Sequence, residues 1–490
     1  MLHKLEAAFK TIIEKPVLAL VVFLGVLSGS TMLYIMNRSH KWLFIFILLI
    51  GFLFVIAKMK SLKNAVVALL IFSFSMNLDF NPWYQNASIG VPISLTAIAL
   101  VVLYIIWLLE IIVKRSPVNF FAATTIPCIT LSLWAVLSIF VSAKPTHTLF
   151  YSTYALEFFL IYFYMANFLK THVEIDLVIK IVAITVAFSA IIGICQYRFP
   201  NMFNFQFIGW ENDLLKLKYA EGIISRAEGF LGHANNLAFF LILWLPLLFL
   251  RTTISSPLKI RILYLSVFSA GALALILTFS RGGWLAFVFS FALILTIFFK
   301  EKVRSTLPHI GKIISSLALI AIVLTAPFYN KIYERLTRDT HGAAYARIPL
   351  AESALRVIEY KPFTGVGLGN YQFMAPRLWY LREAAPVHNI YLHMAAELGI
   401  PASVFFFWLL IAFLQQGIAA LKTQDRWIFL FSLGLTIGLL AVSFHGIFEL
   451  GTIGSQKLLP ISFVGGLLVA INQCRKQIDS EKLPHRRDAV

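Results

Sequence analysis

The sequence has few charged residues and almost no cysteine. Only 13% of its 490 residues are charged and three are cysteines, whereas 59% are hydrophobic and the mean hydropathy is +0.83. Soluble domains carry roughly 25% charged residues, so a soluble globular protein is excluded. Disordered chains are rich in charge, and disulfide scaffolds need many cysteines in a short chain, so these two classes are excluded as well.

The sequence is instead rich in long apolar runs. A membrane-spanning helix needs about 20 mostly apolar residues, so these runs predict an all-α polytopic membrane protein with about 12 to 14 transmembrane helices. The second and third runs are short enough to form one re-entrant pair instead. The candidate spans are 17–36, 42–57, 64–78, 92–113, 122–142, 149–168, 177–195, 237–250, 262–279, 284–299, 314–329, 402–420, 428–448 and 458–472.

The formal net charge of +18 has two explanations. In a soluble protein it would indicate binding to nucleic acid. In a membrane protein, Lys and Arg gather in cytoplasmic loops. With the N-terminus placed in the cytoplasm, the inside loops hold about 23 basic residues and the short outside loops about 4. We therefore expect both termini in the cytoplasm and no nucleic-acid partner.

The predicted spans divide the chain into five parts. Three external segments, at 196–236, 280–283 and 330–401, hold about 13 basic residues on the side that should be poor in them. An anionic ligand at the outer leaflet would explain this excess. The five parts are N-terminal transmembrane helices at 1–236, which end in the first external segment, central helices at 237–329, an external catalytic loop at 330–401, C-terminal helices at 402–474 and a basic cytoplasmic tail at 475–490.

Two arginines stand at external ends of predicted spans. Arg226 precedes a span in ISRAEGFLGHANN, where the pair Asn235–Asn236 is predicted to cap the helix. Arg281 lies between two apolar runs in FSRGGW, where two glycines permit a very tight turn. An arginine at the interface is costly unless paired, and its planar guanidinium suits a bidentate phosphate contact. The alternative is that both side chains extend to lipid headgroups. Glu228 and His233 are weaker candidates that could be solvated.

The external loop at 330–401 is predicted to form a helix, a turn and a helix. Arg347 lies away from an apolar stripe of helical spacing at Ile348, Ala351, Leu355 and Ile358. The glycines of GVGLGN at 365–370 follow no strand, so we interpret them as chain-reversal glycines rather than a nucleotide site.

His388 lies at the start of the second loop helix. Asn389 is predicted to cap this helix, which runs to Leu398 and is closed by Gly399 and Pro401. The positive end of the helix dipole keeps a histidine near neutrality, which suits a general base or a hydrogen-bond partner of a reacting hydroxyl. A capping or surface histidine is the alternative.

Three further ionisable residues fall in apolar surroundings. His445 and Glu449 lie four residues apart at the outer end of a span, where they could pair with each other, with Arg281 or with no catalytic group. Glu157 lies inside the sixth span and needs a partner that the sequence does not identify. We expect no metal and no other cofactor, because no external Asp-x-Asp pair and no His/Cys cluster has ligand spacing.

Together, these residues suit a reaction in which a pyrophosphate leaves and a hydroxyl attacks. Two arginines at external span ends would hold a pyrophosphate and stabilise its departure by fixed positive charge. His388 would accept a proton from the attacking hydroxyl.

The strings SRGGW, ARIPLAESALRVIEYKPFTGVGLGNYQF and PVHNIYLHMAAELGIP resemble the signature of the O-antigen ligase and O-antigen polymerase superfamily, over about residues 226–401. This resemblance implies a bacterial inner-membrane glycosyltransferase of the GT-C type with a periplasmic active site. It implies transfer of a glycan, with inversion, from undecaprenyl diphosphate to a lipid A-core hydroxyl in lipopolysaccharide biosynthesis. Arg281 and Arg226 would bind the diphosphate, His388 would activate or position the acceptor, and Arg347 would contact either substrate.

Other activities share the same features. A polymerase would use another lipid-linked repeat as the acceptor, and a protein O-oligosaccharyltransferase would use a protein hydroxyl. In a different class, a flippase for lipid-linked oligosaccharides is also a bundle of 12 to 14 helices. A transporter places its charges near the bilayer midplane and often has two similar halves. Here the candidate residues gather at one face, which favours the ligase.

Overall fold

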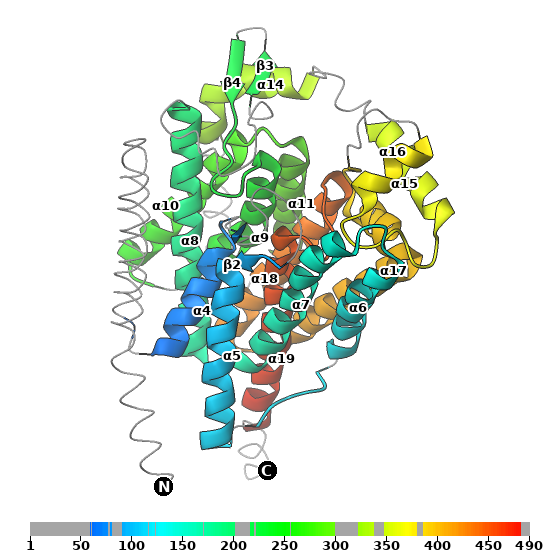
Figure 1. The fold of residues 1–490 in the computed structure, drawn as a ribbon. Coiled ribbons are helices and arrows are strands. Elements are labelled where there is room, and N and C mark those ends of the chain that lie inside the picture. The colour runs from blue at the N-terminus through cyan, green and yellow to red at the C-terminus, as the bar shows by residue number, and fades with distance from the viewer. Residues whose placement is uncertain are drawn as a thin grey trace, which may run out of the picture.

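The described part of the chain is almost entirely helical (Figure 1). The computed structural model describes residues 59, 61–76, 79–80, 91–115, 117–122, 124–169, 171–200, 216–219, 222–254, 256–298, 322–337, 347–379 and 386–481. The predicted spans at 17–36 and 42–57, and the first half of the one at 314–329, lie outside these residues.

The helices follow the predicted apolar runs. The N-terminal half holds α4 (Leu62–Ser73), α5 (Leu95–Lys114), α6 (Thr125–Leu137) with η1 (Ser138–Val141), α7 (Pro145–Phe168), α8 (His172–Arg198) and α9 (Ala234–Thr252). The C-terminal half holds α10 (Leu258–Leu277), α11 (Arg281–Phe298), η3 (Ala326–Phe328), α14 (Tyr329–Thr337), α15 (Arg347–Tyr360), α16 (Tyr371–Trp379), α17 (Ile390–Ala420), α18 (Arg426–His445) with η5 (Gly446–Phe448), and η6 (Gln456–Leu458) with α19 (Leu459–Glu481).

Eight of the described helices are long and apolar enough to cross a membrane. They are α5, α7, α8, α9, α10, α17, α18 with η5, and η6 with α19. Three shorter apolar helices, α4, α6 with η1, and α11, accompany them. The prediction of an all-α polytopic membrane protein is therefore confirmed.

Two short antiparallel strand pairs interrupt the helices. Strand β1 (Asp79–Phe80) pairs with β2 (Ile93–Ser94), and β3 (Lys216–Tyr219) pairs with β4 (Gly222–Ser225). The second hairpin lies in the predicted external segment at 196–236, for which the sequence predicted no strand. In the view of Figure 1 it lies beyond the end of the bundle.

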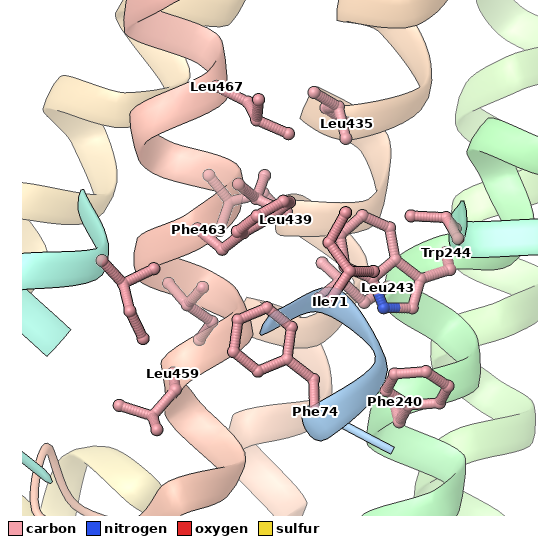
Figure 2. Close-up of a cluster of buried hydrophobic side chains, with 14 of the residues drawn as sticks. Ile71, Phe74, Phe240, Leu243, Trp244, Leu435, Leu439, Leu459, Phe463 and Leu467 are labelled. Atoms are coloured by element: carbon pink, nitrogen blue, oxygen red, sulfur yellow. The ribbon is translucent and has the colours of Figure 1, made fainter. Parts of the chain in front are cut away.

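The core lies where α4, α9, α18 and α19 meet (Figure 2). The Phe463 ring of α19 contacts Phe74, which directly follows α4, and Trp244 of α9, with ring centres 5.4 and 6.1 Å apart. Helix α18 packs closely on α9 because Gly434 and Gly438 face its backbone, and a Cβ at Gly434 would lie 2.6 Å from Cα of Leu247. Small residues of this kind let helices approach closely in a membrane, where packing is the main attraction between them.

Candidate active site at one end of the bundle

Four helix ends meet at one end of the bundle, which we call the His388 end. Helices α9, α11 and α17 begin there and α18 ends there. A Cβ placed on Gly282 in the first turn of α11 would lie 3.1 Å from Cδ2 of His445, the last residue of α18. A Cβ on Gly446 would lie 3.3 Å from Ile390, the first residue of α17. The turn at Arg281 and the start of α17 therefore both pack on the end of α18.

Helix α17, which follows His388, is broken near Gly399. Gly399 has φ +81° and Pro401 has no N–H, so the helix is interrupted, as predicted, and its carbonyls need other donors. The N–H groups of Val366 and Gly367 donate to Ala396 and Glu397 at 3.2 and 2.9 Å. The glycine turn thus completes the hydrogen bonding of the broken helix.

The same turn is anchored on the α6–α7 connection. Asn370 accepts a hydrogen bond from the Lys144 backbone at 2.9 Å, and its Nδ2 donates to Thr148 at 2.8 Å. Gly365, Gly367 and Gly369 all have positive φ, which confirms them as chain-reversal glycines. The turn thereby fixes the start of α17 relative to the bundle.

Helix α15 forms as predicted, but its predicted apolar stripe does not pack on the bundle. Its buried face consists of Ser353, Ala354 and Val357, whereas Ile348 and Leu355 are 62% and 49% exposed. Contact with α16 and α17 determines which face of α15 is buried. The spacing of apolar residues within α15 does not reveal these partners.

His388 lies directly before the capping residue of α17. Asn389 caps the helix as predicted and accepts hydrogen bonds from the N–H groups of Tyr391 and Leu392, both at 3.0 Å. Burial lowers the pKa of His388, Arg347 and Lys457 lower it further, and Glu449 opposes them. The imidazole is therefore neutral near pH 7 and can accept a proton.

Glu449 is the acidic centre of the site. Helix α18 ends at His445, so Glu449 does not pair with it along a helix, and its ion-pair partner is Lys457, with Nζ 2.9 Å from Oε1. The sequence missed Lys457, whereas the interaction with His445 that it considered is present as an electrostatic one. Burial raises the pKa of Glu449, but Lys457 and two histidines, His445 and His233, outweigh burial and lower it to about 2.

His233 caps α9, which corrects the predicted Asn235–Asn236 cap. Its Nδ1 accepts a hydrogen bond from the Asn235 backbone at 3.1 Å. Burial and the nearby charge of Arg226 lower its pKa to about 4, so Nδ1 is a neutral acceptor. His233 is partly exposed and also interacts electrostatically with His388 and Glu449, so it lies at the same end of the bundle.

The α10–α11 turn gathers arginines. Arg226 donates from Nε to the Thr278 carbonyl at 2.7 Å and from Nη2 to Asn235 Oδ1 at 3.1 Å. Arg335 of α14, which is 8% exposed, donates from Nε to the Phe279 carbonyl at 3.2 Å. Both bonded carbonyls lie within three residues of Arg281, the first residue of α11.

The α10–α11 turn has a left-handed residue followed by a helix cap. Phe279 has φ +50°, a conformation that costs a non-glycine residue roughly 1–2 kcal/mol. Ser280 caps α11, because its Oγ accepts from the Gly283 N–H at 3.3 Å and its carbonyl accepts from the Trp284 N–H at 2.9 Å. The sequence predicted the tight turn and Arg281, but Arg335 lay in a segment without a motif and was missed.

The remaining predicted residues take different places. Arg347 begins α15 with its guanidinium 6.0 Å from the centre of the Phe448 ring, close to His388. Glu228 is buried rather than solvated, and burial raises its pKa to about 7. Glu157 lies apart on α7, where Ser94 Oγ donates to its Oε1 at 3.4 Å.

A second buried ionisable pair lies on the first part of α17. His393 Nε2 is 3.6 Å from Glu397 Oε1, which also accepts from the Tyr371 N–H that begins α16, at 3.4 Å. Among the residues that the structure describes, no group of three or more His, Cys, Asp or Glu side chains could hold a metal ion.

Together, the fold and this site define a polytopic α-helical membrane protein with a cluster of arginines and histidines at one end of its bundle. Residues 265–407 match the family model described as O-Antigen ligase. This match confirms the resemblance to the O-antigen ligase and O-antigen polymerase superfamily over that segment. Members of the matched family are glycosyltransferase-like ligases and polymerases. No curated protein matches the chain.

The matched segment covers less than a third of the chain but holds several of the site residues. Arg281, Arg335, Arg347 and His388 lie inside it, whereas Arg226 and Glu449 lie outside.

Proposed function

We propose that this protein is an O-antigen ligase of the bacterial inner membrane, with both termini in the cytoplasm and the His388 end in the periplasm. It transfers a glycan from undecaprenyl diphosphate to a lipid A-core hydroxyl, with inversion and without a metal. The observation that carries the proposal is the gathering of Arg226, Arg281 and Arg335 at the α10–α11 turn, on the end of the bundle that also holds His388.

The arginines suit a diphosphate. Arg281 begins α11, so its side chain and the positive end of that helix both favour an anion there. Arg226 and Arg335 are fixed by bonds from Nε to turn carbonyls. A guanidinium fixed in this way needs no reorganisation when negative charge develops on the leaving group, which is the requirement for electrostatic catalysis.

The proposed step is a single displacement. The acceptor hydroxyl oxygen forms a bond to the anomeric carbon while the bond from that carbon to the diphosphate oxygen breaks. The electron pair leaves with undecaprenyl diphosphate, whose added charge the arginines stabilise. The hydroxyl proton passes to the neutral imidazole of His388, which later releases it to solvent.

The groups around His388 support its role as a base. Arg347 and Lys457 disfavour its protonation before the reaction, while Glu449 stabilises the imidazolium that forms. Asn389 caps α17 and so fixes the backbone next to His388.

The test is glycan transfer in proteoliposomes with purified undecaprenyl-diphosphate glycan and lipid A-core. We expect product with the native protein, also in the presence of a chelator, and none with Arg281→Ala or His388→Ala. Arg356→Ala is the matched control, because Arg356 is an exposed arginine of the same loop and does not contribute to the pKa shift of His388. It should leave the rate unchanged.

Other outcomes distinguish the alternatives. Lengthened lipid-linked glycan without lipid A-core would indicate a polymerase, and glycan on a protein acceptor alone would indicate a protein O-oligosaccharyltransferase. Movement of intact lipid-linked glycan across the bilayer without transfer would indicate a flippase and overturn the proposal.

A further inference from the structure

Two arginines, one buried and one partly buried, lie at the end of the bundle opposite His388. Arg251 is in the last turn of α9 and Arg426 is the first residue of α18. Both helices reach the His388 end at their other termini, and the 19 residues of α9 span about 27 Å at about 1.5 Å per residue. The arginines are therefore about one hydrocarbon thickness away from the site described above.

Arg251 lies over two aromatic rings. Its guanidinium carbon lies 4.7 Å from the centre of the Tyr264 ring and 4.8 Å from that of Trp427, and the residue is 6% exposed. A cation–π contact stabilises the charge of a guanidinium but does not satisfy its N–H groups, which point outward in the plane.

The in-plane donors of Arg251 are poorly used. Nη1 donates to Ser256 Oγ at 3.5 Å, and the side chain also contacts the Tyr264 hydroxyl. Nε is buried and has no hydrogen-bond partner among the residues that the structure describes. A buried charged donor left in this state is costly, which indicates a missing acceptor.

Arg426 also has an unused donor, and it bonds to the chain just after Arg251. Its Nη2 donates to the carbonyl of Thr253, two residues after Arg251, at 2.7 Å. Its Nε is also buried and has no hydrogen-bond partner in the described part of the chain. Two guanidinium groups therefore converge on the end of α9, each with an in-plane donor to offer.

The nearby carboxylates are already engaged. Asp425 accepts from the N–H groups of Trp427 and Ile428 at 2.9 and 3.1 Å, and its Oδ2 lies 3.2 Å from Nε2 of His172. Asp176 pairs with Lys180 at 2.6 Å. Neither neutralises the two arginines, and Lys259 and Arg261 add exposed positive charge at the start of α10.

We propose that Arg251 and Arg426 bind a phosphate group, carried by an anionic phospholipid headgroup of the leaflet at this end. Phosphate oxygens match the planar donor fork of arginine, and at the edge of a bilayer the contact is strengthened by the low dielectric. The two aromatic rings restrict the position of the Arg251 guanidinium, so its donors are preorganised. The site is separate from the glycan-transfer site, and its test does not depend on that function.

The experiment measures lipid retention by native mass spectrometry on the purified full chain in detergent supplied with phosphatidylglycerol. We expect the native protein to retain the lipid and Arg251→Gln and Arg426→Gln to retain it about tenfold more weakly, as expected for one lost charge-assisted hydrogen bond. Arg251→Lys keeps the charge but not the fork and should also bind more weakly. The matched control is Lys259→Gln, which removes an exposed charge at the same end and should bind like the native protein.

A second arm identifies the source of the phosphate and guards against misfolding. Thermal unfolding is followed with phosphatidylglycerol, with phosphatidylcholine and with inorganic phosphate alone. Protection by phosphatidylglycerol that is lost in Arg426→Gln supports a lipid headgroup, even if Arg251→Gln does not fold. If inorganic phosphate alone protects the native protein and this protection is lost in Arg426→Gln, the phosphate site is supported, but its ligand is free phosphate rather than a lipid headgroup. Equal retention and protection in all variants would overturn the proposal.

Discussion

Lys457 and Glu449 form a buried ion pair, with Nζ and Oε1 2.9 Å apart and side chains 10% and 3% exposed. The pair joins the residue after η5 to η6 and lies among the histidines of the His388 end. Glu449 thereby stays ionised in surroundings that would otherwise favour its neutral form.

Lys457→Met should destabilise the protein by about 3–5 kcal/mol, because it leaves a buried carboxylate without its partner. The double variant Lys457→Met with Glu449→Leu should regain most of this loss, since a buried pair replaced by apolar groups is often neutral. Thermal unfolding in detergent measures both. Similar losses in the single and double variants would show that the pair does not account for the effect.

Arg335→Gln should lower kcat/KM for glycan transfer roughly tenfold to a hundredfold, because it removes a fixed positive charge from the proposed diphosphate site. The change should leave the fold intact at the level of thermal unfolding. Lys331→Gln is the control on the same helix, because Lys331 bonds to the Tyr197 hydroxyl rather than to the α10–α11 turn. An unchanged rate in Arg335→Gln would remove Arg335 from the site.

Arg347→Gln should move the acidic limb of the pH profile of kcat/KM to higher pH. Arg347 lowers the pKa of His388, so its removal raises that pKa and protonates the base at a higher pH than in the native protein. Burial and Lys457 still lower the pKa, and Glu449 still raises it. Arg356→Gln, on the same helix, should leave the limb in place. A shift toward lower pH in Arg347→Gln would contradict the assignment of His388 as the base.

His233→Ala should destabilise the protein by about 1 kcal/mol through loss of the α9 cap, and His233→Asn should retain most of the stability. The folded state holds the pKa of His233 at about 4, below its ordinary 6.5. This residue therefore favours the folded state less as pH falls from 6.5 through 4. Between pH 7 and pH 4 the melting temperature should fall less steeply in His233→Asn than in the native protein. Parallel declines would refute the linkage.

Local sequence patterns determined much of this protein. Apolar runs of spanning length need no tertiary context, because each helix satisfies its own backbone in a bilayer. The same local logic located the tight turn at Arg281, the cap at Asn389 and the break at Gly399, since each depends on a few neighbouring residues.

Only the tertiary structure decided which side chains meet. Asn235 was a plausible cap by residue type, but the chain enters α9 so that His233 takes that position and Asn235 bonds to Arg226. Lys457 and Arg335 carry no motif, and they join the site because η6 and α14 pack against distant helix ends. Burial and charge pairing depend on such long-range packing, so the sequence by itself could locate the candidate site but could not complete it.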